Sequence, residues 1–171
     1  SKNASLAALS EEVRRTLDED ITALDRLARR GNRPNPLLAD GLEFSGGAAD
    51  LYGNYKENRW VNYVYAKPTG RHEMSTTFSI GPIPQRAKLR MVARNANTRD
   101  MARLSILLNG QAIVSSEVVF TNTGMTERSF DIPAGALKQG VNTLLIRNEE
   151  DRGSLGMPPW FMIAEAEIVP D

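Results

Sequence analysis

The chain has 171 residues, of which 41% are hydrophobic and 25% charged, and its 21 basic side chains are balanced by 21 acidic ones. This composition is typical of one globular domain, or one domain with an appendage, and the zero net charge argues against attraction of the whole domain to nucleic acid or an anionic membrane. Cysteine is absent and no apolar run approaches the ~18 residues of a membrane span, so neither disulfide bonds nor a transmembrane segment are predicted.

Residues 1–36 are predicted to form an amphipathic helix followed by a linker. Apolar residues recur in this stretch at spacings of three and four: Leu6, Leu9, Val13, Leu17, Ile21, Leu24 and Leu27. Gly31 would end the helix, and Pro34 and Pro36 would prevent it from resuming. Two interpretations of its apolar face remain open. The favoured one is that the helix packs on the chain's own domain or is a linker helix of a larger protein, and the other is that it serves self-association or a partner.

From Gly41 onward the apolar residues alternate with a period of two, which predicts β-strands. The predicted strands are 42–44, 60–66, 76–80, 88–94, 103–108, 112–120, 130–132, 142–146 and 162–168. Asn109 and Gly110 lie between two of them and suit a tight hairpin turn, because both central positions of such a turn take positive φ. With no helical pattern between the strands, residues 37–171 are predicted to form an antiparallel β-sandwich domain.

The last strands carry more detailed expectations. Pro133 should end one strand, Leu137 should plug the core from a short turn, and Gly140 should occupy a corner too tight for a side chain. In the last strand two sets of residues are expected on opposite faces: Met162, Ala164, Ala166 and Ile168 on one, and Ile163, Glu165 and Glu167 on the other.

Three segments resemble the second half of galactose-binding-like jelly-roll domains: ARLSILLNGQAIV (102–114), FDIPAGALKQGVNTLLIRN (130–148) and WFMIAEAEIV (160–169). The segment ENRWVNYVYA (57–66) is similar in place to the early Trp-bearing strand of carbohydrate-binding modules with this fold. The resemblance covers residues 42–169. It implies a galactose-binding-like jelly-roll β-sandwich that binds carbohydrate, often as an accessory domain of a polysaccharide-degrading enzyme. It also implies the option of a structural Ca²⁺, for which Glu43, Glu165 and Glu167 are the available carboxylates.

The residue types of common catalytic sites are scarce. With His72 as the one histidine and no thiol, zinc chemistry and catalytic triads are disfavoured. The acidic residues 149–151 are flanked by Arg147 and Arg152, and a self-neutralising surface loop is the better interpretation than a pair of glycosidase carboxylates. Catalysis by this chain alone is therefore not expected.

Aromatic residues make up 6% of the chain, and two stretches that resemble loops contain several of them. Tyr52, Asn54 and Tyr55 lie in one, and Arg152 and Trp160 in the other. Aromatic rings stack on the C–H faces of sugars while amide and guanidinium groups bind hydroxyls, so these five residues are the candidate ligand site. A role for Trp160 as an apolar plug at the end of the sandwich is equally open.

These observations predict a noncatalytic carbohydrate-binding or accessory β-sandwich module of a bacterial extracytoplasmic protein, either periplasmic or secreted. Its partner would be a carbohydrate or a neighbouring catalytic domain. The alternative is a structural or protein-interaction domain without a sugar site, which docks or self-associates through its N-terminal helix. A small lyase or hydrolase is a third and less favoured interpretation.

Overall fold

The computed structural model describes residues 42, 44–55, 59–96 and 98–171, and only the backbone of residues 52, 54, 55, 59 and 60. The predicted N-terminal helix and linker, residues 1–36, lie outside the described residues. None of the helices in the described part has the length and apolar character that a membrane crossing requires.

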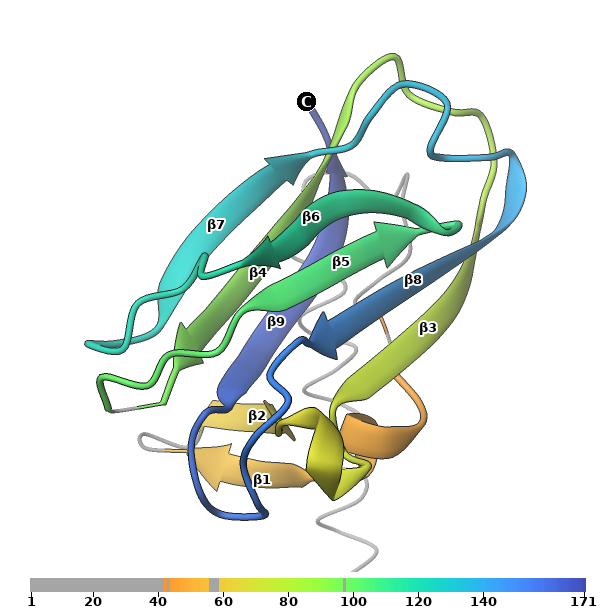
Figure 1. The fold of residues 1–171 in the computed structure, drawn as a ribbon. Helices are drawn as coiled ribbons and strands as arrows, with labels where there is room; N and C mark the ends of the chain where they lie inside the picture. Colours follow the sequence, from red (N-terminus) through yellow and green to blue (C-terminus); the bar gives the residue numbers. More distant parts are fainter. Residues whose placement is uncertain (1–41, 43, 56–58, 97) are drawn as a thin grey trace, which may run out of the picture. The chain divides into compact units, whose positions relative to one another are not determined.

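The described chain from residue 42 onward forms two antiparallel sheets packed face to face (Figure 1). Sheet I contains, in spatial order, β1 (Tyr52–Tyr55), β2 (Arg59–Val64), β9 (Phe161–Pro170), β4 (Ala87–Asn95) and β7 (Thr126–Asp131). Sheet II contains β3 (Glu73–Ile80), β8 (Gly140–Asn148), β5 (Leu104–Leu108) and β6 (Gln111–Glu117). Two short 3₁₀ helices, η1 (Gly47–Asp50) and η2 (Lys67–Thr69), lie in the connections. The predicted antiparallel β-sandwich is confirmed.

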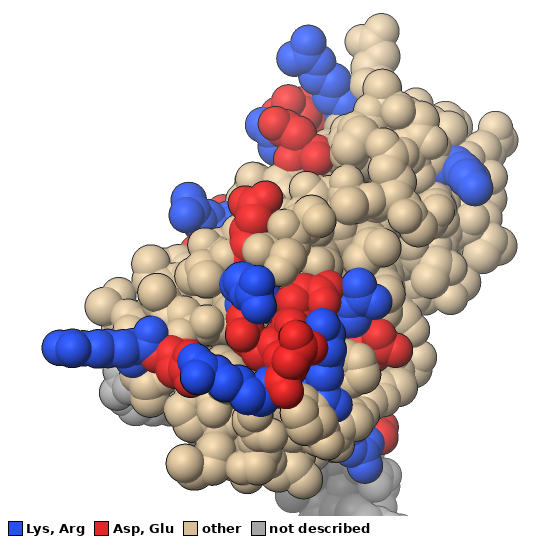
Figure 2. Space-filling view, viewed as in Figure 1, with Lys and Arg blue, Asp and Glu red and all other residues tan. Residues whose placement is uncertain are grey.

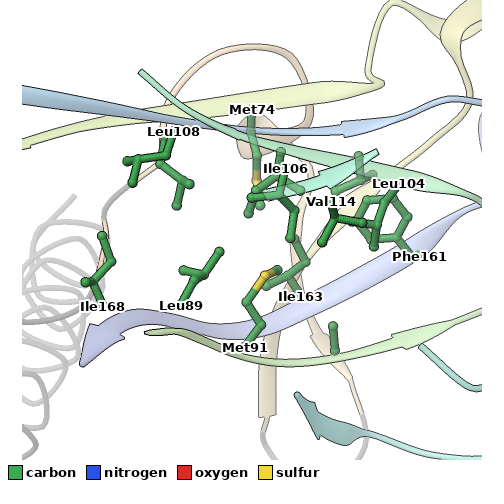
Figure 3. Close-up of a cluster of buried hydrophobic side chains, with 14 of the residues drawn as sticks. Met74, Leu89, Met91, Leu104, Ile106, Leu108, Val114, Phe161, Ile163 and Ile168 are labelled. Atoms are coloured by element: carbon green, nitrogen blue, oxygen red, sulfur yellow. The ribbon is translucent and has the colours of Figure 1, made fainter. Parts of the chain in front are cut away.

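The hydrophobic core lies between the two sheets and takes alternate residues from their strands. Sheet II contributes Met74, Leu104, Ile106, Leu108 and Val114, which face Leu89, Met91, Phe161, Ile163 and Ile168 of sheet I (Figure 3). This arrangement follows from the period of two, because successive side chains of a strand point to opposite faces of its sheet.

A β-bulge changes which residues of β9 face the core. The register of β9 on β4 passes from Ile163 directly to Glu165 and skips Ala164. The core-facing residues are Phe161 and Ile163 before the bulge, and Ala166 and Ile168 after it. The prediction that Ile163 and Ile168 point to opposite faces is therefore wrong, because one extra residue in the strand shifts its alternation.

The first described residues cross from one sheet to the other. The Leu42 amide donates to the Ala166 carbonyl of β9 (3.4 Å), and Ser45 exchanges two backbone hydrogen bonds with Ser75 of β3 (2.7 and 3.0 Å). Leu42 and Phe44 pack against the core between these two contacts. Neither residue is in a strand, so the predicted strand at 42–44 is wrong for both of them. The described residues of this segment instead bond β9 of sheet I at Leu42 and β3 of sheet II at Ser45.

The two turns that the sequence predicts, at Asn109-Gly110 and at Gly140, are both present. The physical reason for the glycine at 140 differs from the predicted one. Asn109 and Gly110 join β5 to β6 with φ of 52° and 82°, as a tight hairpin requires. Leu137 is buried in the core. Gly140 has φ of 87°, yet an added Cβ would meet no atom within 4 Å. The predicted steric clash is wrong, and the corner needs glycine for its backbone conformation alone.

The corner before β8 is fixed by the fully buried side chain of Asn142. Its Oδ1 accepts from the Lys138 amide and from Asn109 Nδ2, both at 2.8 Å. Its Nδ2 donates to the carbonyls of Lys138 (2.7 Å) and Gly140 (2.9 Å). A buried amide is tolerated when its donors and acceptor are bonded in this way.

The corner gives a first prediction. Replacing Gly140 with Val should destabilise the domain by about 1–3 kcal/mol, because a β-branched residue is strained at positive φ. The matched control is Gly81→Val, at a loop glycine without positive φ and with no atom near its added Cβ. Urea denaturation followed by circular dichroism measures both. Equal losses of stability in the two variants would contradict the account of this corner.

Candidate functional site

Residues 52–55 form a strand and not the loop that the sequence predicted. They pair with β2 in an antiparallel hairpin at the edge of sheet I, from Tyr52 opposite Asn62 to Tyr55 opposite Arg59 (Figure 1). The side chains of Tyr52, Asn54 and Tyr55 lie outside the described part of the chain. Their contribution to a ligand site therefore stays a prediction.

Three aromatic side chains meet on the outer side of sheet I, and we call them the aromatic cluster: Tyr63, Tyr65 and Trp160. Trp160 lies edge-on to Tyr63, with ring centroids 5.7 Å apart and planes at 69°, and its centroid is 6.2 Å from that of Tyr65. The two tyrosine rings are stacked with centroids 6.4 Å apart and planes at 20°. All three side chains are half-buried. The cluster thus presents aromatic surface without being part of the main core.

Strand alternation explains why these rings gather there. Val64 is fully buried in the core, so its neighbours Tyr63 and Tyr65 point to the opposite face of the sheet. Phe161 is likewise in the core, which turns Trp160 outward. Val64 and Phe161 are partners in the register of β2 on β9, which brings the three rings side by side. The sequence pattern predicts a strand at Tyr63 and Tyr65, and their spacing of two already places them on one face, but the predicted site did not include them.

The connection between β8 and β9, residues 149–160, is attached to the residues that follow β2. The Lys67 amide donates to the Glu150 carbonyl (2.9 Å). At Gly153, φ is 137° and an added Cβ would lie 2.9 Å from the Cβ of Ala66, so the two backbones approach closely. Arg152 of the same connection donates to Asp100 Oδ1 (3.0 Å), and 78% of its side chain is exposed. Trp160 and Arg152 therefore belong to one anchored loop.

Alternating charges anchor this loop, and Figure 2 shows Lys and Arg intermingled with Asp and Glu low on the face it draws. The ion pairs at residues 149–151 are Lys67–Glu149 (3.2 Å), Lys67–Asp151 (3.1 Å), Arg147–Glu149 (2.9 Å) and Arg103–Glu150 (2.8 Å). Each of the three carboxylates faces a cation and not another acid. The predicted neutralisation is confirmed for Arg147, whereas Arg152 pairs with Asp100 and the remaining cations, Lys67 and Arg103, come from other segments.

The carboxyl of Glu149 carries the largest electrostatic effect in this loop. Burial by itself would raise its pKa, but hydrogen bonds from the Ser105 hydroxyl, Arg147 and Lys67 outweigh burial and lower the pKa to about 2. An acid whose pKa is lower in the folded than in the unfolded chain stabilises the fold when it is ionised.

The carboxylates proposed for calcium have another partner in the structure. Arg90 of β4 donates to Glu165 (3.0 Å), to Glu167 (2.8 Å) and to Glu127 of β7 (2.7 Å). No group of three His, Cys, Asp or Glu side chains suited to a metal ion occurs among the described residues, and Glu43 lies outside them. The described carboxylates thus fit a guanidinium and do not by themselves fit a calcium ion, which prefers six to eight oxygen ligands.

No family model matches the chain, and no curated protein matches its sequence. Solved structures with a similar arrangement of strands include the CBM36-1 domain of a multidomain xylanase from the hindgut metagenome of Trinervitermes trinervoides (11% identity, 79% of this chain and 94% of that one, TM-score 0.47). A carbohydrate-binding module CBM36 in complex with calcium and xylotriose is 12% identical, with 77% and 95% of the chains covered and a TM-score of 0.46. The CBM35 from Paenibacillus barcinonensis is 16% identical, with 78% and 91% covered and a TM-score of 0.43.

These solved structures are carbohydrate-binding modules, the class of domain that the sequence resembles. At identities of 11–16% and TM-scores below 0.5, none of them identifies a ligand or a binding residue of this chain.

The loop anchor gives a second prediction. Glu149→Gln should lower stability at pH 7, and the difference from the wild type should shrink as the pH falls from about 4.5 towards about 2, where the wild-type carboxyl also becomes protonated. Urea denaturation at pH 7, 4 and 2.5 measures this difference. The control is Glu117→Gln, at an exposed carboxylate of β6. A difference that is the same at every pH would contradict the ionic role of Glu149.

Proposed function

We propose that residues 42–171 form a noncatalytic carbohydrate-binding module whose ligand surface is the aromatic cluster of Tyr63, Tyr65 and Trp160. The observation that carries this proposal is that three rings from two distant segments meet on the outer side of a sheet, half-buried and apart from the main core. Aromatic rings of this kind stack on the apolar faces of sugars, and nearby polar groups orient the hydroxyls.

We assign that second task to polar groups of the same loop, of the β4–β5 connection and of the neighbouring strand β1. Arg152 and its partner Asp100 are exposed, and either group can exchange this surface ion pair for a hydroxyl at little cost. On β1, an added Cβ at Gly53 would lie 3.3 Å from the Tyr63 ring, so this strand runs directly beside the cluster. The register of β1 on β2, with Gly53 opposite Val61, gives Tyr55 a position on the same face as Tyr63, so we propose Tyr55 as a further member of the site. Tyr52 and Asn54 alternate with it along the strand and stay predictions from the sequence.

A binding role without catalysis is supported by the pairing of the acids. The carboxylates of residues 149–151 face cations, and Glu165 and Glu167 face Arg90, so these acids are not arranged as a proton-donating and a nucleophilic pair. We propose an accessory module of a bacterial extracytoplasmic protein, with a glycan or a neighbouring catalytic domain as its partner.

The site is tested by a glycan array followed by calorimetric titration of the best oligosaccharide, each with added Ca²⁺ and with EDTA. Trp160→Ala and Tyr65→Ala should each weaken binding about tenfold or more, because each removes a stacking ring. Their melting temperatures should change little, since neither ring is part of the main core. Binding that survives in EDTA would show that the rings act without a metal ion.

The control is Leu155→Ala, at a residue of the same loop with 59% exposure and outside the aromatic cluster, which should bind as the wild type does. If the wild type binds no glycan across a broad array, the proposal fails and a structural or protein-interaction domain takes its place. If Trp160→Ala unfolds the domain while Tyr65→Ala binds normally, Trp160 is a structural plug and the aromatic cluster is not the ligand surface.

A further inference from the structure

Asn148, the last residue of β8, has a side chain completely removed from water. Its Nδ2 donates to the Val64 carbonyl (3.1 Å) and to the Pro159 carbonyl (3.3 Å). Its Oδ1 accepts from the Glu150 amide (3.0 Å). Both amide protons and the amide oxygen are therefore bonded, to the backbone of β2 at one position and of the β8–β9 connection at two.

The two carbonyls that Asn148 binds belong to the backbone that carries the aromatic cluster. Val64 lies between Tyr63 and Tyr65, and Pro159 immediately precedes Trp160. Val64 is 84 positions from Asn148 along the chain and Pro159 is 11 positions from it, so the contact joins segments that are distant in sequence. One side-chain amide thus ties together the two segments whose rings meet.

We propose that Asn148 is a positioning residue of the ligand surface, which sets the separation of the Tyr63–Tyr65 strand from Trp160 and so determines ligand affinity. This inference rests on the proposed function for its effect on binding, but not for its effect on ring geometry. A residue at this place needs two donors and one acceptor, a combination that a neutral amide supplies and that a carboxylate or an aliphatic side chain of similar size does not.

The β8–β9 connection has other anchors besides Asn148. Loss of the Asn148 amide can therefore move Trp160 without unfolding the domain. When the Asn148 amide is lost, the Lys67–Glu150 backbone bond and the close approach of Gly153 to Ala66 remain. These contacts hold the first half of the loop, and at its far end the Ala96 amide still donates to the Trp160 carbonyl (2.9 Å). Residues 159 and 160 then lose their side-chain tie to β2, so we expect the domain to fold with Trp160 displaced from the two tyrosines.

The test compares two asparagines of equal burial at different corners of the sandwich. Asn142, which is also fully buried, bonds the turn before β8, and its hydrogen-bond partners Asn109, Lys138 and Gly140 are not in the aromatic cluster. Asn148→Leu and Asn142→Leu each remove a bonded amide from the interior, so both should lose stability. Asn148→Ser and Asn142→Ser are the milder pair, used in place of the leucine variants if either of those fails to fold.

The readout is the emission of Trp160 in a Trp60→Phe background, measured well below the melting temperature of each variant. In Asn148→Leu, or in the serine variant if used, we expect emission at longer wavelength and stronger quenching by acrylamide, whereas the matching Asn142 variant should emit as its parent does. For a glycan that binds the wild type, affinity should fall roughly tenfold in the Asn148 variant only, as is usual when a residue that orients a binding group is removed.

The two proposals can fail separately. A changed Trp160 emission in a domain that binds no glycan would support the positioning role and remove the carbohydrate function. Unchanged emission in a folded Asn148 variant, or equal changes in the Asn148 and Asn142 variants, would overturn the positioning role whatever the glycan results are.

Discussion

Backbone groups at the ends of strands have no partner in the sheet, and in this sandwich fully buried asparagine side chains bond them. Asn95 binds the Ala102 amide and the carbonyls of Ala102 and Phe120, which holds the connections beyond β4 and β6. Asn142 and Asn148 do the same before and after β8. An amide left without hydrogen bonds in the interior lowers the free energy of unfolding. Each of these side chains therefore favours the loop arrangement in which its hydrogen bonds are made.

The same constraint connects the fold to the proposed function. The β8–β9 connection begins with acids held by Lys67, Arg103 and Arg147, and it ends with Trp160 against Tyr63 and Tyr65. Its polar start is anchored by ion pairs. Its aromatic end is anchored by the Asn148 amide at Pro159 and by the Ala96 amide, which donates to the Trp160 carbonyl. A ring that is fixed before the ligand arrives loses little conformational freedom on binding, which favours affinity in a surface with few contacts.

Much of the fold is predictable from the sequence because it follows from local rules. The period of two predicts the sandwich, the Asn-Gly pair predicts the hairpin after β5, and Leu137 is recognisable as an apolar residue in a polar turn. Features set by pairing with distant strands are not predictable in this way. The bulge at Ala164 arises from the register on β4, and residues 52–55 read as a loop because their Gly and Asn are typical of turns, while their strand depends on β2.

Only part of the candidate site could be predicted from the sequence, again because the rest depends on the pairing of distant strands. Trp160 and Arg152 could be singled out by residue type, whereas the role of Tyr63 and Tyr65 depends on the packing of β2 beside β9, which one strand read alone does not reveal. Asn148 carries no local signal, since a polar residue at the end of a strand is common. The positions of Glu165 and Glu167 on β9 were predicted, but their partner Arg90 is apparent only once β4 lies beside that strand.

The central claim is that the carbohydrate ligand binds to the aromatic cluster. An NMR titration tests this claim most directly. Isotopically labelled protein would be titrated with the oligosaccharide selected by the array, following the indole N–H signal of Trp160, the ring signals of Tyr63 and Tyr65, and those of Phe161 in the core as a reference. The account predicts saturable shifts of the three cluster signals with Phe161 nearly unchanged. Shifts confined to residues of sheet II, with the Trp160 indole unmoved at saturation, would contradict it.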